Sequence, residues 1–487
     1  MEEESNQLNG NFCVKKFVEF LIAVVLTVVV WNLPSSAFGI DGLTVVQQRV
    51  IAIFVFATIM WLTEAIPSWA TSLAIITVML LTVSNNSFSF FRDDTAGNLG
   101  TLIKSKAIMA TFADPIIILF LGGFVMAIAA TKAGLDFRLA RTLLRPFGHK
   151  SEMVLLGFIL ITGIFSMFVS NTATAAMMLT FLAPVFKALP PGGKGKVALT
   201  LSIPVAANIG GMATPIGTPP NAIALKYLND PEGLNLGIGF GQWVSFMLPY
   251  VLVMLVISWF LLKKFFPFSQ RTINLEINGS VQRNWRTVVV GVTFVVTILL
   301  WMFDKLTGID ANTVAIIPIG IFAATGVITA RDLEKINWSV IWMVAGGFAL
   351  GLGLKDTGLA DAAIESIPFG NWSPIVIIII SCLICYLLSN FISNTATAAL
   401  LIPIIATVCS GMSGTLAGGG STIMIIGIAI AASAAMCLPI STPPNAIAHS
   451  TGLVQQNEML KIGIIVGIIT LLLGYVVLFS ASALHLI

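Results

Sequence analysis

Two short polar strings each occur twice in this chain, in the same order and at nearly the same spacing. SNTATAA occupies residues 170–176 and returns at 393–399, while TPPNAIA occupies 218–224 and returns at 442–448. Their starts lie 48 residues apart in the first pair and 49 in the second. Both strings carry residues that cap or break helices, so the fold must accommodate the same two interruptions twice.

The strings lie in a chain whose composition is that of a membrane protein. Hydrophobic residues make up 57% of its 487 residues, charged residues make up 10%, and the mean hydropathy is +0.97. So little charge cannot cover the surface of a soluble protein of this length, so lipid must be the solvent for most of it. The net charge of +3 is too small and scattered to predict a nucleic-acid partner. Because no HExxH motif or carboxylate pair appears, we expect no enzyme.

Stretches of about 20 apolar residues can cross a bilayer as helices. Eleven such spans are predicted, at 17–33, 47–64, 67–84, 114–133, 197–225, 240–263, 287–303, 311–328, 339–355, 422–450 and 459–484. Two further apolar stretches, 152–188 and 372–408, carry SNTATAA near their middle and are predicted to be re-entrant helical hairpins. The spans at 197–225 and 422–450 contain the TPPN breaks. The fold class is therefore an all-α polytopic membrane protein.

Charge and span count together predict an inverted-topology repeat. With the N-terminus in the cytoplasm, most loop lysines and arginines fall inside, which is the positive-inside pattern. Five spans separate the hairpins, and because five is odd, the second half must be inverted relative to the first. The predicted divisions are an N-terminal segment with the first span (1–46), a first repeat (47–265), a cytoplasmic linker (266–286) and a second repeat (287–487) that ends outside. We expect a multi-pass protein of a plasma membrane, such as a bacterial inner membrane. Inverted repeats with broken helices are typical of secondary transporters.

The repeated strings predict four helix N-termini near the membrane midplane. Thr218 and Thr442 suit the N-cap, while the prolines that follow them suit the first helical position. The Ser-Asn-Thr clusters can cap the second arm of each hairpin. Each N-terminus carries about +0.5 charge, so four offer on the order of +2, enough for a dianion without lysine or arginine. A single SNTATAA is more often a packing face and a single TPPN more often a kink, but paired copies favour a binding site.

At these residues the chain resembles the divalent anion/Na⁺ symporter family, which includes Na⁺-coupled dicarboxylate and citrate carriers. The likeness rests on paired SNT motifs, each followed by a GTPPN or STPPN break, and runs from the second span to the C-terminus. It implies a homodimer in which a transport domain moves as an elevator against a scaffold domain, with Na⁺ as the coupling ion. Substrate carboxylates would meet Asn171, Thr172, Thr218, Pro219, Asn394, Thr395, Thr442 and Pro443. Cation sites would use Ser166, Ser170, Asn171 and the backbone at Gly217, and Ser389, Ser393, Asn394 and the backbone at Ser441.

Cargo and coupling stay open at this point. C4 to C5 dicarboxylates such as succinate, malate, fumarate or 2-oxoglutarate are the expected cargo, because no cationic side chain is at hand for a third carboxylate; sulfate is a second candidate. Intact SNT motifs favour Na⁺ symport over exchange of one dicarboxylate for another. An anion channel built from the same helix N-termini is the alternative from another class. The halves also differ, since Thr214 corresponds to Leu438 and Gly217 to Ser441, which predicts an asymmetric pocket.

Overall fold

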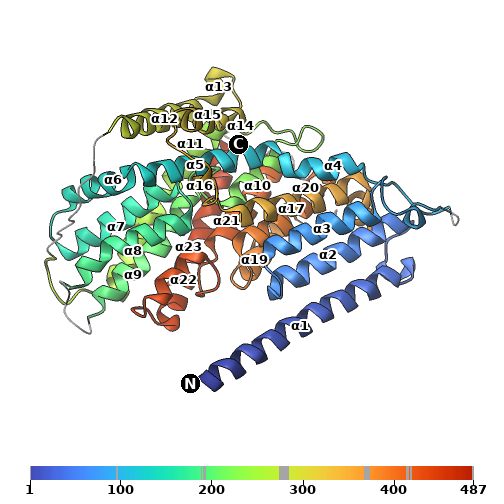
Figure 1. Cartoon of the computed structure of the whole chain (residues 1–487), viewed down its shortest axis with the longest axis horizontal. Helices are drawn as coiled ribbons and strands as arrows, with labels where there is room; N and C mark the ends of the chain where they lie inside the picture. Colours follow the sequence, from blue (N-terminus) through green and yellow to red (C-terminus); the bar gives the residue numbers. More distant parts are fainter. Residues whose placement is uncertain are drawn as a thin grey trace.

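The computed structural model describes residues 2–94, 97–187, 189, 193–273, 284–366, 373–412, 416 and 419–484, and every regular element within them is a helix (Figure 1). The first helices are α1 (Glu2–Asn32), α2 (Val45–Thr63), α3 (Ser68–Thr82), α4 (Ser105–Ala110), α5 (Pro115–Lys132) and α6 (Leu135–Leu144). A central group comprises α12 (Trp285–Met302), α13 (Asp304–Thr307), α14 (Ala311–Val314), α15 (Ile316–Ala324), α16 (Ala330–Leu333), α17 (Trp338–Asp356) and α18 (Leu359–Ser366). Residues 274–283 of the predicted linker lie outside the described residues, as do 188, 190–192 and 367–372 at the hairpin margins.

The repeated strings fall in two helical blocks of the same order. The first block is α7 (Ser151–Ser166), α8 (Asn171–Lys187), α9 (Gly195–Gly211), α10 (Pro219–Leu228) and α11 (Phe240–Phe265). The second is α19 (Pro374–Ser389), α20 (Asn394–Gly411), α21 (Gly420–Ala434), α22 (Pro443–Ser450) and α23 (Gln456–Ala483). Helix α9 packs on α7, α8 and α11, and α21 packs on the counterparts α19, α20 and α23. The two blocks therefore repeat one packing scheme.

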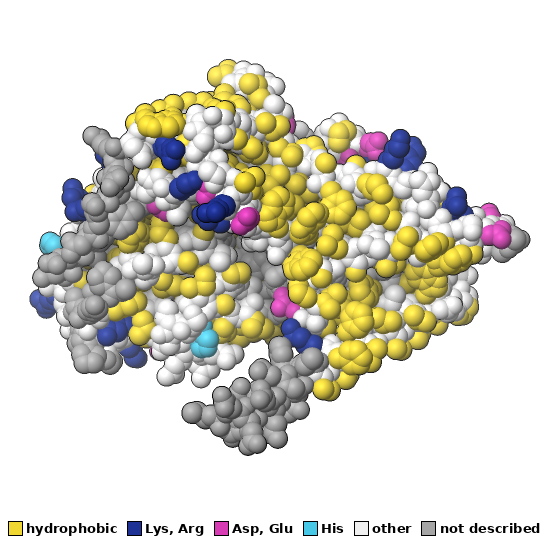
Figure 2. All heavy atoms as spheres, in the orientation of Figure 1, with side chains coloured by type: hydrophobic (Ala, Val, Ile, Leu, Met, Phe, Trp, Pro, Cys, Tyr) yellow, Lys and Arg dark blue, Asp and Glu magenta, His cyan; other side chains and the backbone are white. Residues whose placement is uncertain are grey.

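The helices fit a polytopic membrane protein. Within the described residues, seven are long and apolar enough to cross a bilayer: α2, Ser105–Lys132 (which contains α5), α11, α12, α17, α20 and α23. Other predicted spans are shorter apolar helices, such as α3, or are divided at a TPPN break, as α9 and α10 are. Hydrophobic side chains cover much of the face in Figure 2. On α12, for example, Val288, Val292 and Val295 are exposed, as expected for a surface in contact with lipid.

Three consecutive polar residues near the start of α2 satisfy the C-terminal ends of three other helices. Gln48 Nε2 donates to three carbonyls at the end of α1, at 2.6 to 3.1 Å. Gln47 Nε2 donates to Thr357 O just beyond α17 (2.9 Å), and Arg49 donates to Thr82 O at the end of α3 (3.1 Å). Carbonyls at helix ends lack partners within their own helix, so these contacts fix where α1, α3 and α17 meet α2.

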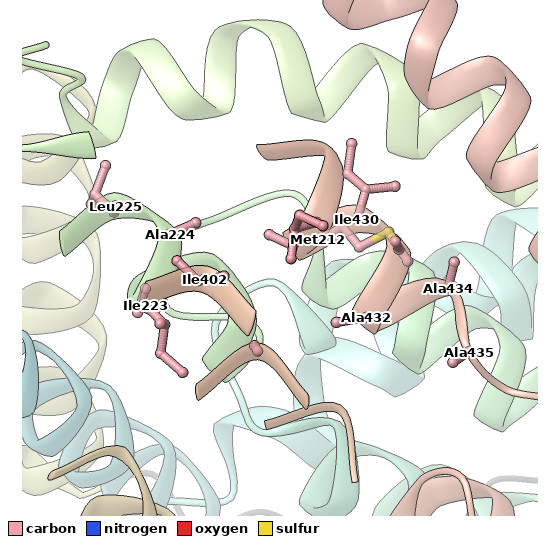
Figure 3. Close-up of a cluster of buried hydrophobic side chains, with 14 of the residues drawn as sticks. Met212, Ile223, Ala224, Leu225, Ile402, Ile430, Ala432, Ala434 and Ala435 are labelled. Atoms are coloured by element: carbon pink, nitrogen blue, oxygen red, sulfur yellow. The ribbon is translucent and has the colours of Figure 1, made fainter. Parts of the chain in front are cut away.

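Apolar packing surrounds the two helix breaks. Figure 3 shows Met212, at the end of α9, with Ile223 of α10, Ile402 of α20 and Ile430 of α21, all of which are buried. Small residues, among them Ala432 and Ala434, let the helices of the two blocks approach closely. The irregular backbone at the breaks is thus enclosed by protein, as it must be at membrane depth.

Candidate functional site

The helices that begin at the repeated strings pack against one another across the two blocks. Helices α8 and α20 begin at the SNT asparagines, and α10 and α22 begin at the first proline of each TPPN. Helix α10 packs against α20, and α22 packs against α8. Each TPPN helix therefore contacts the SNT helix of the other block, which joins the two half-sites.

The serines predicted at the SNT turns have the same contacts in both halves. Ser170 Oγ accepts from Ala173 N and Ser393 Oγ accepts from Ala396 N, each at 3.3 Å, so both act as N-caps. One turn earlier, Ser166 Oγ donates to Ala207 O on α9 (2.8 Å). Ser389 Oγ donates to Ala432 O on α21 (2.9 Å). These bonds hold each turn against the broken helix of its own half.

Asn171 faces a group of oxygen atoms. One end of its side-chain amide lies 2.6 Å from Ser166 Oγ and 3.2 Å from both Ala207 O and Gly217 O. With the amide nitrogen at this end, Asn171 donates to these acceptors. With its oxygen there, the side chain adds a fourth oxygen to this group, and oxygen groups beside unwound backbone bind Na⁺ in transporters. Of the residues predicted for the first cation site, Ser166, Asn171 and the carbonyl of Gly217 therefore lie together, and Ser170 acts as the N-cap.

The second half-site repeats the contact between serine and asparagine but differs in the loop that follows. Asn394 Oδ1 lies 2.9 Å from Ser389 Oγ, whose single proton can go either to Asn394 or to Ala432 O. Ser441 lies in the next loop, where its hydroxyl donates to Asn390 O (2.8 Å) and accepts from Leu438 N (3.1 Å). Ser389 and Asn394 are therefore adjacent, and Ser441 contacts the residue that follows Ser389.

Gly217 explains one of the two sequence differences between the halves. A Cβ atom at Gly217 would lie 2.4 Å from Gly211 O, which leaves no room for a side chain. The hydroxyl is supplied instead by Thr214, which donates to Met167 O (2.5 Å) and accepts from Gly217 N (3.1 Å). In the second half Ser441 supplies it. The hydroxyl therefore comes from Thr214 in the first half and from Ser441 in the second. In both halves it donates to a backbone carbonyl of the hairpin turn, at Met167 or at Asn390.

The asparagine of each TPPN string holds its helix break together. Asn221 Nδ2 donates to Gly211 O, Met212 O and Thr214 O at 2.9 to 3.2 Å. Asn445 Nδ2 donates to the corresponding Met436 O and Leu438 O at 2.8 and 3.0 Å. Carbonyls freed where α9 and α21 end are thereby satisfied without water.

The two N-cap threonines are not equivalent. Both have extended backbone, and prolines follow in the first turn, as expected. Thr442 Oγ1 accepts from Asn445 N (3.3 Å), whereas the Thr218 side chain makes no capping bond. The sequence therefore predicted the position of both caps correctly. The side-chain capping bond forms only at Thr442.

Charge at this centre comes from the backbone. The first turns of α8, α10, α20 and α22 contain no acidic or basic residue. The four termini together offer on the order of +2. Thr172, half-buried, and Thr395, buried, add hydroxyls one position into α8 and α20. The arrangement can stabilise a dianion by N–H groups, hydroxyls and amides.

A cavity of about 910 Å³ lies at the opposite ends of α10 and α20, and none of the predicted site residues lines it. Lys226 Nζ lies 2.5 Å from Asp114 Oδ2 and 3.5 Å from the ring centroid of Phe348. Lys355 Nζ lies 3.0 Å from Asp230 Oδ2. The lining also contains Glu232, Asp304, Asp310, Asp356 and Asp361. With both lysines paired and acids in excess, this cavity is a poor candidate for holding a dianion.

Sequence reasoning missed several residues of the centre. Ala207 and Ala432 contribute backbone carbonyls, which leave no trace in a sequence. Asn221 and Asn445 had a signal, since both TPPN copies end in the same amide. Asn208 also escaped notice; it lies on α9, and its Nδ2 is 3.2 Å from Thr442 Oγ1 of the other half.

Comparison with known proteins gives two kinds of likeness. The chain matches the model of the family described as "Sodium:sulfate symporter transmembrane region" over residues 14–484. The sodium-dependent dicarboxylate transporter SdcS of Staphylococcus aureus (strain USA300) is 30% identical, over 94% of this chain and 90% of the relative. SdcS of Staphylococcus saprophyticus is 29% identical, over 94% and 91%.

Solved structures share the fold. MtrF of Neisseria gonorrhoeae aligns with a TM-score of 0.53 at 13% identity, over 86% of this chain and 96% of that protein. The YdaH transporter of Alcanivorax borkumensis aligns with a TM-score of 0.56 at 10% identity, over 86% and 99%. At such low identity these two structures bear on the fold alone.

Proposed function

Because this chain belongs to the sodium:sulfate symporter family, we propose that it is a secondary active transporter that carries small dicarboxylates together with Na⁺. Family membership confirms the resemblance drawn from the paired motifs. The SdcS relatives are named sodium-dependent dicarboxylate transporters, which supports both this cargo class and Na⁺ as the coupling ion. Those names are of transporters, which favours transport over catalysis.

The observation that carries the proposal is the packing of each TPPN helix against the SNT helix of the other block. In this proposal the N–H groups of the four helix N-termini that remain free of capping bonds surround one centre, where no ionised side chain competes for the cargo. Two carboxylates of a C4 to C5 acid would each meet one SNT helix and one TPPN helix. Asn171, Thr172, Thr218 and Pro219 would contact one carboxylate, and Asn394, Thr395, Thr442 and Pro443 the other.

Na⁺ would act by completing the first half-site. Around Asn171 the ion would take the place of the amide protons. The side-chain amide would then rotate, so that its oxygen joins the other three oxygens. Asn171 would then present its nitrogen to the cargo, so cation and dianion would bind cooperatively. In the second half-site Ser389, Ser393, Asn394 and the backbone at Ser441 would hold a second ion, where Ser389 Oγ lies 2.9 Å from Asn394 Oδ1.

The two blocks support an inverted-topology repeat with re-entrant hairpins at α7–α8 and α19–α20. We propose that these blocks form the transport domain and move as an elevator against α2, α3, α5 and α17 in a homodimer. The N-terminus would be cytoplasmic and the C-terminus outside, in a plasma membrane. Elevator movement needs the cargo centre to travel as a unit, which the cross-block packing supports.

Two rival functions differ in what drives flux. A cation-independent exchanger would need internal dicarboxylate and no Na⁺ gradient, and the sodium dependence named for the SdcS relatives argues against it. An anion channel would show neither saturation nor counterflow. The test is uptake of radiolabelled succinate by proteoliposomes with an inward Na⁺ gradient, with no Na⁺, and with internal succinate. Saturable uptake that requires the Na⁺ gradient supports symport; uptake that requires internal succinate alone supports exchange.

A further inference from the structure

We propose that Asn208 is a positioning residue that turns the Thr442 hydroxyl into a dedicated hydrogen-bond donor for one cargo carboxylate, an inference that rests on the proposed function. Asn208 lies in α9 of the first block and is 1% exposed. Its Nδ2 lies 3.2 Å from Thr442 Oγ1 and 3.4 Å from Asn445 Oδ1, both in the second block. It thus connects the half-sites at the cap of a TPPN helix.

The argument follows from the number of hydrogen bonds that a hydroxyl group can donate and accept. A threonine oxygen has two lone pairs and one proton. Thr442 Oγ1 accepts from Asn445 N at 3.3 Å and from Asn208 Nδ2, so both lone pairs are occupied. The remaining proton must go to an acceptor. An ionised carboxylate is acceptor-only, whereas a protonated carboxyl group also presents a donor that Thr442 can no longer receive.

The other half lacks this device. Ser166 bonds Ala207 O and Ser389 bonds Ala432 O, so Ser433, the next residue of α21, corresponds to Asn208. Ser433 is buried, and neither its Oγ nor Asn221 Oδ1 has a hydrogen-bond partner. A serine is too short to make the bridge that an asparagine makes. The Thr218 hydroxyl therefore keeps a free lone pair and can accept as well as donate.

A purely structural role for Asn208, as a link between α9 and α22, is the competing explanation. It is separable, because Asn208 Oδ1 is itself buried without a partner. Asn208→Leu keeps the volume and removes both the donor and the unsatisfied oxygen, so the variant is expected to fold. Ser433→Ala is the matched control, since it removes the corresponding side-chain oxygen in the other half.

The experiment measures the KM and Vmax of Na⁺-driven succinate uptake by proteoliposomes from neutral to mildly acidic pH. Because Thr442 loses its fixed donor direction, Asn208→Leu should raise KM about tenfold at neutral pH, with Vmax little changed. Lowering the pH should raise the KM of Asn208→Leu less steeply than that of the wild type. In the variant, a lone pair of Thr442 Oγ1 is free to accept from the protonated carboxyl group of the succinate monoanion. Ser433→Ala should keep the wild-type pH profile.

A second comparison tests the route through Thr442. In a Thr442→Val background, Asn208→Leu should raise KM no further, because the group that it positions is gone. The proposal is overturned if Asn208→Leu lowers Vmax with an unchanged pH dependence of KM, or if its effect persists in Thr442→Val. Absence of any uptake by the wild type would overturn the proposed function along with it, whereas normal uptake with an unaffected Asn208→Leu variant overturns this inference alone.

Discussion

The two half-sites have the same sequence strings and the same packing, yet the break beside the first asparagine has a glycine where the second has a serine. Asn171 turns one end of its amide to three acceptors, among them Gly217 O at 3.2 Å. Asn394 has the corresponding serine contact, with its Oδ1 2.9 Å from Ser389 Oγ, and Ser441 takes the place of Gly217. The first break therefore brings the carbonyl of Gly217, an oxygen of the kind that binds cations, close to its asparagine. We therefore expect the first half-site to depend more strongly on Na⁺.

The comparison also shows that a difference in sequence need not be a difference in structure. Thr214 Oγ1 donates to Met167 O in one half, and Ser441 Oγ donates to Asn390 O in the other. Each carbonyl belongs to the residue that directly follows the first arm of its hairpin. The threonines that open the TPPN strings are identical residues, but only Thr442 is bonded by Asn208 and Asn445. We therefore expect the two halves to differ in function at Thr218 and Thr442, which are the same residue type but have different hydrogen-bond partners.

The largest effect is expected at the SNT asparagines. Asn171→Ala and Asn394→Ala each remove an amide that the proposed cargo and cation sites share, so Na⁺-driven succinate uptake should fall by at least about 100-fold in both. The proteins should remain folded, which size-exclusion chromatography in detergent checks. Wild-type uptake in either variant would remove that half-site from the account.

Gly217 should be less tolerant than its counterpart. Gly217→Ala places a Cβ atom against Gly211 O and should destabilise the protein by about 3 kcal/mol. Ser441→Gly loses two hydrogen bonds and should cost about 2 kcal/mol. Thermal unfolding in detergent compares the two, and equal losses would contradict the close approach of the first break.

Loss of a TPPN asparagine should destabilise the break that it holds. Asn221→Ala and Asn445→Ala leave buried carbonyls without donors, so each should lower the free energy of unfolding by about 2 kcal/mol. The effect at Asn221 should be at least as large, because it bonds three carbonyls and Asn445 bonds two. Ser450→Ala, an exposed change on α22, is the control. No shift in the melting temperature of either variant would contradict this role.

The smallest effect is expected at the ion pair beside the cavity. Lys226 and Asp114 are partly exposed, at 24% and 15%, so a double-mutant cycle with Lys226→Met and Asp114→Asn should give a coupling of about 1 kcal/mol. Succinate binding should be unchanged in both variants, since neither residue belongs to the proposed site. A selective loss of binding in Lys226→Met would move the cargo site to the cavity.

Local signals predicted the breaks well. Capping residues and prolines act within one turn, and the helices begin at Asn171, Pro219, Asn394 and Pro443, where the strings place them. The sequence did not predict the contributions of Ala207 O and Ala432 O, because a backbone carbonyl is the same at every residue. The bridge from Asn208 to Thr442 joins residues 234 positions apart, which no local pattern encodes. Long-range packing decided these contacts.

The central claim is that helix N-termini and amides, rather than charged side chains, hold the dianion, and that Na⁺ completes the site. Equilibrium binding of radiolabelled succinate to the purified protein, with Na⁺ or with choline as the cation, tests it directly. Saturable binding in Na⁺ that disappears in choline and in Asn171→Ala, and persists in a Lys226→Met/Lys355→Met variant, is the predicted result. Equal binding in choline, or its loss in the double lysine variant, would contradict the account.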